Sequence, residues 1–256
     1  MKRSRFPMVI TVLCLLFFYL PIAILVANSF NASRFSMVWG GLSLKWYLRL
    51  FQDREIWHAL SNTLLIAVTA TAAATVIGTL AAFALHRYRG RLQQIHYALV
   101  FTPLVVPDIL MGMSLLLFFV ALSVPLGLGT VFLAHVTFCI SYVAMVVLAR
   151  LQDFDTALIE AAQDLGAGRL TVLWRVILPL LAPGISAGAL LAFTLSVDDF
   201  VITFFVAGPG ATTLPIQVYS MIKHGSPPMI NALSAILLVF TLIMVSASQR
   251  LMEKQP

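Results

Sequence analysis

Long runs of apolar residues, separated by short polar or basic segments, make up most of this chain. An α-helix needs about 20 apolar residues to cross a bilayer. Six runs qualify, at about residues 7–28, 59–85, 97–121, 130–149, 183–206 and 231–249. The runs are continuous and lack the alternation of a half-buried strand, which favours helices. The pattern therefore predicts an all-α, polytopic membrane protein with six transmembrane helices.

Composition strengthens this prediction. Of the 256 residues, 61% are hydrophobic and 10% are charged, whereas a soluble domain carries about a quarter charged residues. A water-soluble protein of this length could not cover so much apolar surface. Both cysteines, Cys14 and Cys139, lie inside apolar runs, which argues against a disulfide framework or a zinc site. We expect residues 1–256 to form a single membrane domain.

The basic residues predict the orientation of the chain. The net charge of +6 does not indicate a nucleic-acid partner, because the lysines and arginines recur in short clusters between apolar runs. Eleven of them lie in one set of loops: Lys2, Arg3, Arg5, Arg87, Arg89, Arg91, Arg150, Arg169, Arg175, Arg250 and Lys254. Five lie in the other set: Arg34, Lys45, Arg49, Arg54 and Lys223. Because basic loops remain in the cytoplasm, both termini are predicted to be cytoplasmic.

Local features refine the runs. The second run is rich in small residues, so it can pack closely against its neighbours. Pro103 and Pro107 should bend the third run or break its hydrogen-bond ladder. Gly184 and Gly188 form a GxxxG pattern that permits close helix approach, in this subunit or across to a partner. A short helix is expected at 214–223, inside the loop 207–230.

One cytoplasmic loop, from residue 150 to about 182, is much longer than the others. Asp155 or Thr156 can cap a helix there, and Gly166 suits the left-handed position that ends it. We expect a second helix from about Leu170 to near Pro179, before the fifth run opens. By pattern alone, the loop is either a helical hairpin packed under the bundle or a docking surface whose small alanines admit another protein.

The same loop resembles a known family motif. Glu160-Ala161-Ala162, then Gly166, then Val176-Ile177-Leu178-Pro179 resemble the EAA motif, with valine in place of isoleucine as the only departure. The motif marks the membrane subunits of bacterial ABC importers with the type I (MetI-like) fold. The resemblance implies that Glu160, Ala161, Ala162 and Gly166 belong to a coupling helix that docks into a cytoplasmic ATPase.

Other segments extend the resemblance over essentially the whole chain. Ser196-Val197-Asp198-Asp199 and residues 28–31, 45–47, 135–139, 208–215 and 231–233 are similar to the permease subunits of spermidine/putrescine importers. The resemblance implies that the chain forms half of a polyamine pathway in the bacterial cytoplasmic (inner) membrane. The implied partners are a related permease subunit, a homodimer of ATPase subunits and a periplasmic polyamine-binding protein. ATP and Mg would bind the ATPase, so this chain is expected to hold no cofactor.

Three acidic residues lie within the predicted spans. Asp108 is about halfway along the third, and Asp198 and Asp199 are about two-thirds along the fifth. A carboxylate there costs roughly 3 kcal/mol on insertion scales, so it usually faces a wet cavity or a partner. Adjacent residues are about 100° apart on a helix, so both can point into one cavity wall. With no basic residue in any span to neutralise them, the acids predict a site that a cation visits. The alternative for each is a hydrogen bond to a neighbouring helix, or protonation.

Other side chains add little to the site. Phe200, Phe204, Phe205 and Tyr219 can offer cation–π faces, although packing is the commoner role of such aromatics. The histidines show no metal-ligand spacing, and we assign them no chemistry. The dipeptide Gly-Lys does not occur, so the chain has no phosphate-binding loop and is not expected to be an enzyme that hydrolyses ATP.

Three alternatives differ in function. The first is a type I importer permease for another substrate. The second is a proton-coupled secondary transporter, which would also use buried acids but should show internal repeats that are not visible here. The third is an intramembrane aspartyl enzyme, in which two acids on different helices share a proton. That reading leaves the EAA loop without a purpose.

Overall fold

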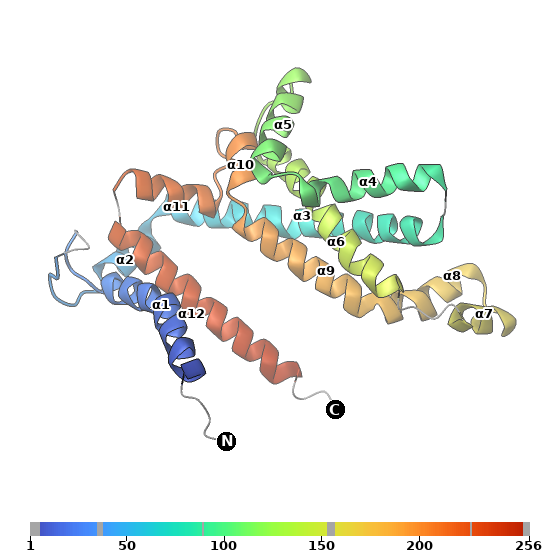
Figure 1. The fold of residues 1–256 in the computed structure, drawn as a ribbon. Helices are drawn as coiled ribbons and strands as arrows, with labels where there is room; N and C mark the ends of the chain where they lie inside the picture. The colour runs from blue at the N-terminus through green and yellow to red at the C-terminus, as the bar shows by residue number, and fades with distance from the viewer. Residues whose placement is uncertain (1–5, 35–37, 89, 153–156, 226, 253–256) are drawn as a thin grey trace. The chain divides into compact units, whose positions relative to one another are not determined.

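The computed structural model describes residues 6–34, 38–88, 90–152, 157–225 and 227–252. Over these ranges the chain is helical, and its one β-type pairing is an isolated bridge between Asn31 and Leu42. The helices (Figure 1) are α1 (Phe6–Ser29), α2 (Lys45–Gln52), α3 (Arg54–Arg87), α4 (Arg91–Val105), α5 (Asp108–Ala121), α6 (Leu128–Gln152), α7 (Ala157–Asp164), α8 (Arg169–Val172), the π-helical turn η1 (Leu173–Ile177), α9 (Leu178–Asp198), α10 (Val201–Val206), α11 (Leu214–Lys223) and α12 (Pro227–Met252). The predicted all-α class is confirmed, and α11 matches its expected range.

Among the described residues, four helices are long and apolar enough to cross a membrane: Met8–Ser29, Arg54–Arg87, Leu128–Gln152 and Arg169–Asp198. The pair α4 and α5 makes a fifth if it is counted as one bent span. In α12 the apolar stretch that the structure describes, Pro228–Ile243, is shorter than the others. Length and composition therefore support four or five spans, and the sixth stays a prediction.

The third predicted span is broken, as its prolines indicated. The chain bends by 114° between α4 and α5 (Figure 1). Val106 has extended backbone angles, φ −73° and ψ 129°, because the ring of Pro107 disfavours the helical conformation of the residue before it. Pro103 lies inside α4. The break is therefore at Pro107, and Asp108 becomes the first residue of α5.

The fifth predicted span, 183–206, is interrupted before its predicted end, and its helix begins earlier than expected. α9 stops at Asp198, Asp199 is extended with φ −65° and ψ 121°, and α10 restarts at Val201. At the other end, the helix expected to stop near Pro179 continues from Arg169 to Asp198. A proline inside a helix lacks an N–H and crowds the carbonyl four residues before it. The wider π-helical turn η1 lies immediately before Pro179 and lets the helix pass it.

Residues 58–216 form one of two compact units, and α6 runs through its core. Val143 and Val147 on α6 are fully buried. α9 packs along α6, where a Cβ atom added at Gly188 would lie 3.4 Å from the Val143 Cα atom and one added at Gly184 would lie 2.9 Å from the Arg150 Cβ atom. The GxxxG pattern thus serves a close contact within this chain. Four alanines of the second run are also fully buried: Ala67, Ala70, Ala74 and Ala82 are 0% exposed.

The other unit contains residues 1–57 and 217–256. α12 packs against α1 and α2, and α1 and α12 run in opposite directions (Figure 1). The indole N–H of Trp46 on α2 donates a hydrogen bond to the Asn31 carbonyl at 2.8 Å. Lys45 and Arg49 lie over the same ring, 4.7 and 5.1 Å from its centre. These contacts fix α2 within its unit.

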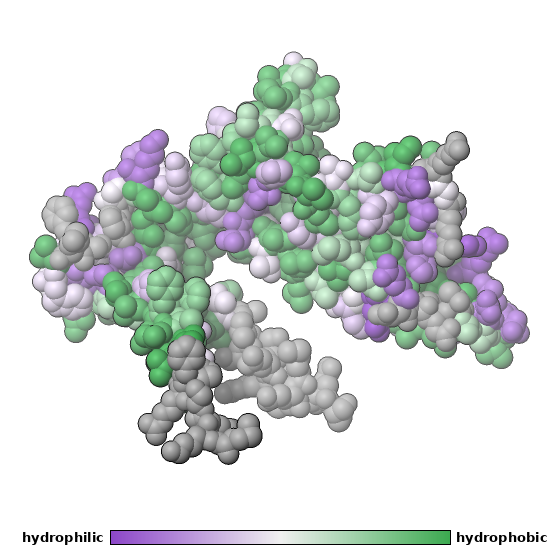
Figure 2. Space-filling model, viewed as in Figure 1, coloured by the Kyte–Doolittle hydropathy of each residue, from purple (hydrophilic) through white to green (hydrophobic). Residues whose placement is uncertain are grey.

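Apolar side chains cover much of the surface, as expected of a protein surrounded by lipid. Figure 2 shows hydrophobic residues over α5 and hydrophilic residues gathered at the end of residues 58–216 that carries α7 and α8. On α1, Phe17 and Met8 are 75% and 70% exposed. The chain therefore leaves long apolar helix faces open along its spans.

We predict that Gly78→Ala destabilises the protein. A Cβ atom at Gly78 on α3 would lie 2.9 Å from the Ile140 carbonyl oxygen on α6, so the two helices would have to separate. Overpacking of this kind costs about 1–3 kcal/mol. Thermal unfolding of the purified protein in detergent should show a lower Tm. Gly129→Ala is the matched control, because a Cβ atom there meets nothing within 4 Å. Equal melting of the two variants would contradict the prediction.

Candidate functional site

A cavity of about 270 Å³ lies at the break between α9 and α10. Its walls come from α4, α5, α6, α9 and α10. The lining residues are Pro103, Asp108, Phe138, Tyr142, Thr194, Leu195, Asp198, Asp199, Phe200, Val201 and Ile202. The three acids singled out from the sequence thus line one cavity, although they come from two separate breaks in the helices.

Asp199 uses its carboxylate to hold the broken helix together. The carboxylate accepts hydrogen bonds from the backbone N–H groups of Ile202 at 3.3 Å and Thr203 at 2.8 Å, and from the Thr203 hydroxyl at 2.6 Å. The first N–H groups of a helix have no partner within it, so these bonds cap α10. The side chain is only 10% exposed. Asp199 therefore stabilises the break, and its position is explained without a ligand.

His135 is the residue that the sequence prediction missed. Its ring lies in α6 and is 1% exposed, with Nε2 3.4 Å from Asp199 Oδ2. Nδ1 lies 2.7 Å from the Ser196 hydroxyl, and Nε2 lies 2.9 Å from the Thr203 hydroxyl. The expectation that no basic group in a span faces the acids is therefore wrong for Asp199. The signal was a histidine inside an otherwise apolar run, which must find polar partners.

Asp198 and Asp108 differ from Asp199. Both are exposed, and neither carboxylate accepts a hydrogen bond from the residues that the structure describes. Asp198 is the last residue of α9, so it and Asp199 do not share the regular helix that we expected. Asp108 is not midway along a straight helix but opens α5, where the helix dipole favours a negative charge. Two carboxylates thus line the cavity without a hydrogen-bond partner among the described residues.

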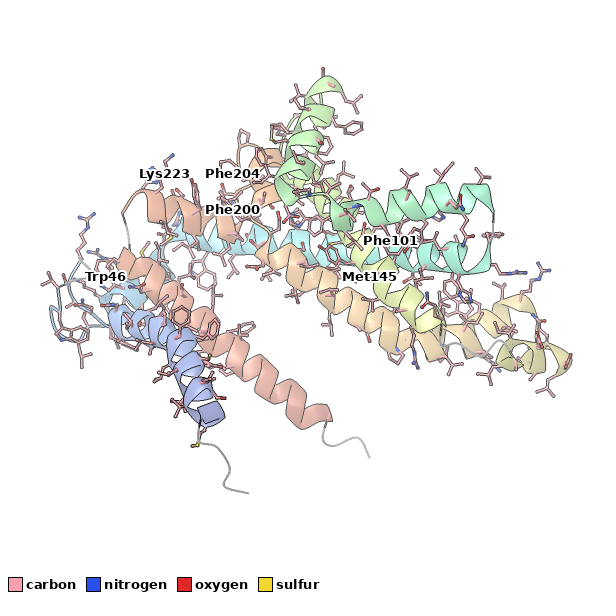
Figure 3. All side chains as sticks on the ribbon, viewed as in Figure 1. Trp46, Phe101, Met145, Phe200, Phe204 and Lys223 are labelled. Atoms are coloured by element: carbon pink, nitrogen blue, oxygen red, sulfur yellow. The ribbon has the colours of Figure 1, made fainter. Side chains whose placement is uncertain are left out.

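Aromatic rings lie beside these acids. Phe138 and Tyr142 of α6 and Phe200 of the break line the cavity. Phe200 stacks near Phe204, with ring centres 5.5 Å apart (Figure 3). The first two were not predicted, yet His135, Phe138 and Tyr142 are spaced three and four residues apart, which places them on one helix face.

The other aromatics proposed from the sequence have different positions. A Cβ atom at Gly112 would lie 2.7 Å from the ring of Phe205, so this ring packs α10 against α5. Phe204 is 51% exposed. Tyr219 belongs to the unit of residues 1–57 and 217–256. Of the four aromatics first considered, only Phe200 lines the cavity.

The EAA residues lie on and after α7. Gly166 has φ +82°, and the N–H groups of Gly166 and Ala167 donate to the carbonyls of Gln163 and Ala162. This is the Schellman end that the sequence predicted. Asp155 and Thr156, the expected caps at its start, lie outside the described residues. Glu160 and Ala161 are exposed, Ala162 is half-buried, and no residue of α7 is buried.

α9 connects the two regions. It begins next to α8 and η1, which contact α7, and ends at the cavity (Figure 1). Its 21 residues span about 30 Å at a rise of 1.5 Å per residue. α7, which carries Glu160, Ala161 and Ala162, therefore lies near the first end of α9, and the cavity lies at its other end. None of the EAA residues lines the cavity.

Two enzyme-like features find no support in the described parts of the chain. No group of three or more His, Cys, Asp or Glu residues there is arranged to hold a metal ion. Residues 184–188 also fit the Gly-x-Ser-x-Gly pattern, which in hydrolases requires a sharp strand-to-helix turn. Ser186 instead lies inside α9, and its hydroxyl donates to the Pro183 carbonyl at 3.0 Å.

An all-helical membrane chain with an acidic cavity and an EAA loop defines a transport subunit, and comparison with known families agrees. Residues 74–254 match the family described as the inner membrane component of binding-protein-dependent transport systems. This chain belongs to that family. The resemblance drawn from the EAA motif is thereby confirmed.

Curated relatives are similar over nearly the whole chain. The spermidine/putrescine transport system permease protein PotC of Escherichia coli K12 is 45% identical over 233 residues, covering 91% of this chain and 88% of that protein. The PotC protein of Haemophilus influenzae is 42% identical over 238 residues, covering 93% of each. The E. coli K12 putrescine transport system permease protein PotI is 46% identical over 244 residues, covering 92% of this chain and 86% of that one.

A solved structure shares the fold. A chain of a bacterial ABC transporter involved in the import of the acidic polysaccharide alginate superposes with a TM-score of 0.75, over 98% of both chains, at 18% identity. At that identity the likeness concerns the fold alone. The chain thus has the fold of a type I (MetI-like) importer permease.

We predict that alanine substitutions at the adjacent residues Asp198 and Asp199 change the free energy of unfolding by different amounts. Asp199→Ala should lower the free energy of unfolding by about 1–3 kcal/mol, because it leaves α10 uncapped and His135 without its acidic neighbour. Asp198→Ala should leave stability within about 0.5 kcal/mol of the unsubstituted protein, since it breaks no internal contact. Thermal unfolding in detergent measures both. A larger loss for Asp198→Ala would mean that Asp198 has the structural role.

Proposed function

We propose that this chain is the permease subunit that forms half of the translocation pathway of an ATP-driven polyamine importer, with spermidine and putrescine as substrates. Asp108 and Asp198 attract the substrate's ammonium groups, and Asp199 lines the same wall while capping α10. The observation that carries the proposal is a pair of exposed carboxylates in one cavity, neither of which has a hydrogen-bond partner in the part of the chain that the structure describes.

The chemistry of the cavity suits these cations. Spermidine and putrescine are flexible chains with two or three ammonium groups, so separated anions in a poorly screened cavity recognise them. At an effective dielectric of about 20, one ion pair at 4 Å is worth roughly 4 kcal/mol before desolvation is subtracted. Phe138, Tyr142 and Phe200 add aromatic faces on which a cation can rest. The relatives named for spermidine and putrescine transport support the same substrate class.

The second part of the proposal concerns energy coupling. The docking surface for a separate ATPase consists of Glu160, Ala161, Ala162 and Gly166. That ATPase binds ATP and Mg and acts as a homodimer. The open surface of α7 and the exposed side chain of Leu165, at 89%, support docking over a hairpin buried under the bundle. A second, related permease subunit completes the pathway, and a periplasmic polyamine-binding protein delivers the substrate.

Residues 1–256 act as one permease domain in this proposal, with both termini in the cytoplasm. The mechanism is alternating access: ATP binding brings the ATPase subunits together, and α7 transmits that movement to the spans. The cavity then faces outward, accepts the cation and later releases it inside.

Two transport alternatives remain distinct from this proposal. A type I importer for another substrate would share the EAA loop but would not depend on Asp108 and Asp198 for polyamine uptake. A proton-driven carrier would transport polyamine without nucleotide. Uptake by proteoliposomes with and without internal ATP separates the carrier from the importer, and competition by unlabelled amines tests the substrate class.

We predict that Asp108→Asn and Asp198→Asn each lower polyamine uptake at least about tenfold, as expected for the loss of one charged hydrogen bond. Asparagine keeps the shape and removes the charge, so assembly of the complex and docking of the ATPase should be retained. Radiolabelled spermidine uptake into proteoliposomes is the measurement, with ATP hydrolysis and subunit composition determined on the same sample.

Asp108→Glu and Asp198→Glu are the matched controls. They keep the negative charge and add one methylene, so each should retain more uptake than the corresponding asparagine variant. Normal uptake by the Asp108→Asn/Asp198→Asn double variant would refute the assignment of the acids to the pathway.

We further predict that Ala162→Trp abolishes ATP-driven uptake. The bulky ring on α7 would block close approach of the ATPase, while the cavity at the far end of α9 is untouched. The ATPase should be lost from the complex during purification, and the two permease subunits should remain folded together. Co-purification and polyamine-stimulated ATP hydrolysis are the two readouts.

Ala121→Trp, at the exposed end of α5, places the same ring outside the loop and should leave the ATPase bound. If the ATPase stays associated and polyamine-stimulated in the Ala162→Trp complex, the docking assignment is wrong.

A further inference from the structure

One buried side chain ties together the segments that form the break beside the cavity. His135 extends from α6, is 1% exposed and does not line the cavity itself. Its Nδ1 atom pairs with the Ser196 hydroxyl in the last turn of α9, at 2.7 Å. Its Nε2 atom pairs with the Thr203 hydroxyl in α10, at 2.9 Å, and faces Asp199 Oδ2 at 3.4 Å. A single ring thus contacts both sides of the break.

The direction of these hydrogen bonds follows from the hydroxyl of Thr203. That hydroxyl has one hydrogen, which it donates to Asp199 Oδ2 at 2.6 Å. It must therefore accept a hydrogen bond from His135, so Nε2 carries a proton. The carboxylate of Asp199 also accepts the N–H groups of Ile202 and Thr203. Oδ2 of Asp199 is consequently engaged by Thr203 and His135, and Oδ1 by Ile202.

Asp198 lies between the two anchored residues. Ser196, two residues before it, and Asp199, directly after it, both contact His135. The carboxylate of Asp198 has no hydrogen bond to any described residue and lines the cavity. Its direction is therefore set by where the chain leaves α9, and that point is fixed by the network around His135.

We infer that His135 is a positioning residue for substrate passage: its hydrogen bonds to Ser196, Thr203 and Asp199 hold the break so that Asp198 presents its charge to the cavity. This inference rests on the proposed function, because it assigns His135 to the site at which a polyamine cation passes. The effect is indirect, since His135 does not line the cavity.

A histidine that only fills the core would behave differently from a positioning residue. Its replacement would weaken folding, and its effect on uptake would multiply with that of any other substitution, as expected for independent sites. A positioning residue that acts through Asp198 has no further effect once the charge of Asp198 is gone. The double-mutant cycle between residues 135 and 198, whose side chains are not hydrogen-bonded to each other, distinguishes the two cases.

The experiment uses the full complex in proteoliposomes and compares the unsubstituted chain, His135→Gln, Asp198→Asn and the double variant. Glutamine keeps an N–H donor for Thr203 and Asp199 but loses the bond to Ser196. We expect His135→Gln to lower uptake at subsaturating spermidine about tenfold, the scale of one hydrogen bond to a charged network. Basal ATP hydrolysis should remain near that of the unsubstituted complex, and the lost bond to Ser196 should lower Tm without preventing assembly. The double variant should fall to the level of Asp198→Asn alone.

Ser141→Ala is the matched control. Ser141 is 1% exposed on the same helix, and its hydroxyl has no hydrogen-bond partner among the described residues. Spermidine uptake by the Ser141→Ala complex should therefore equal that of the unsubstituted complex. If His135→Gln does not accumulate in the membrane, Thr203→Val tests the same network from α10 in an identical cycle. Failure of both variants to fold would show a folding requirement and overturn the inference.

The remaining outcomes separate this inference from the proposed function. If the two single effects multiply in the double variant, His135 does not act through Asp198, and this inference alone is overturned. If Asp198→Asn itself transports spermidine normally, the assignment of the acids to the pathway fails as well. A loss confined to the histidine variants, with Asp198→Asn normal, would make His135 part of the core only.

Discussion

A carboxylate in an apolar surrounding must be satisfied or exposed, and Asp199 shows how this chain meets that constraint. Its carboxylate accepts the free N–H groups at the start of α10 and lies 3.4 Å from His135. Non-helical backbone at membrane depth is tolerated where it is buried in protein or lines a cavity. The interrupted helix, the cavity at the interruption and the exposed charge of Asp198 all depend on that capped end.

Two interruptions with different origins meet at the same cavity. At Pro107 the chain itself forbids a continuous helix, because the residue before a proline is driven out of the helical conformation. At Asp199 nothing in the local sequence forbids it. The Asp199 carboxylate caps α10 there, and His135 of α6 contacts Ser196, Asp199 and Thr203 around the break. The first interruption delivers Asp108 and the second delivers Asp198. Their convergence turns two isolated acids into one anionic site.

The path between the cavity and the EAA loop is a tightly packed helix pair. Gly188 lets the backbone of α9 approach α6, and η1 carries the helix past Pro179 without a break. A closely packed protein interior has low compressibility, so displacement of one part is transmitted to its neighbours. In the proposed mechanism this stiffness matters, because movement of α7 at one end of α9 reaches the break at the other. In that proposal the adjacent acids have different roles: Asp199 caps α10, and Asp198 attracts the cation.

The sequence by itself determined the features that depend on neighbouring residues: the apolar runs, the break at Pro107, the left-handed end at Gly166, the short helix α11 and the family motif. Length, proline and glycine act locally, so their pattern is enough. Only the tertiary structure decided that α9 passes Pro179 and stops at Asp198. It also decided which acid is capped and which is free. That choice depends on His135, far away in the sequence, and a hydrogen-bond partner on another helix leaves no periodic signal along the chain.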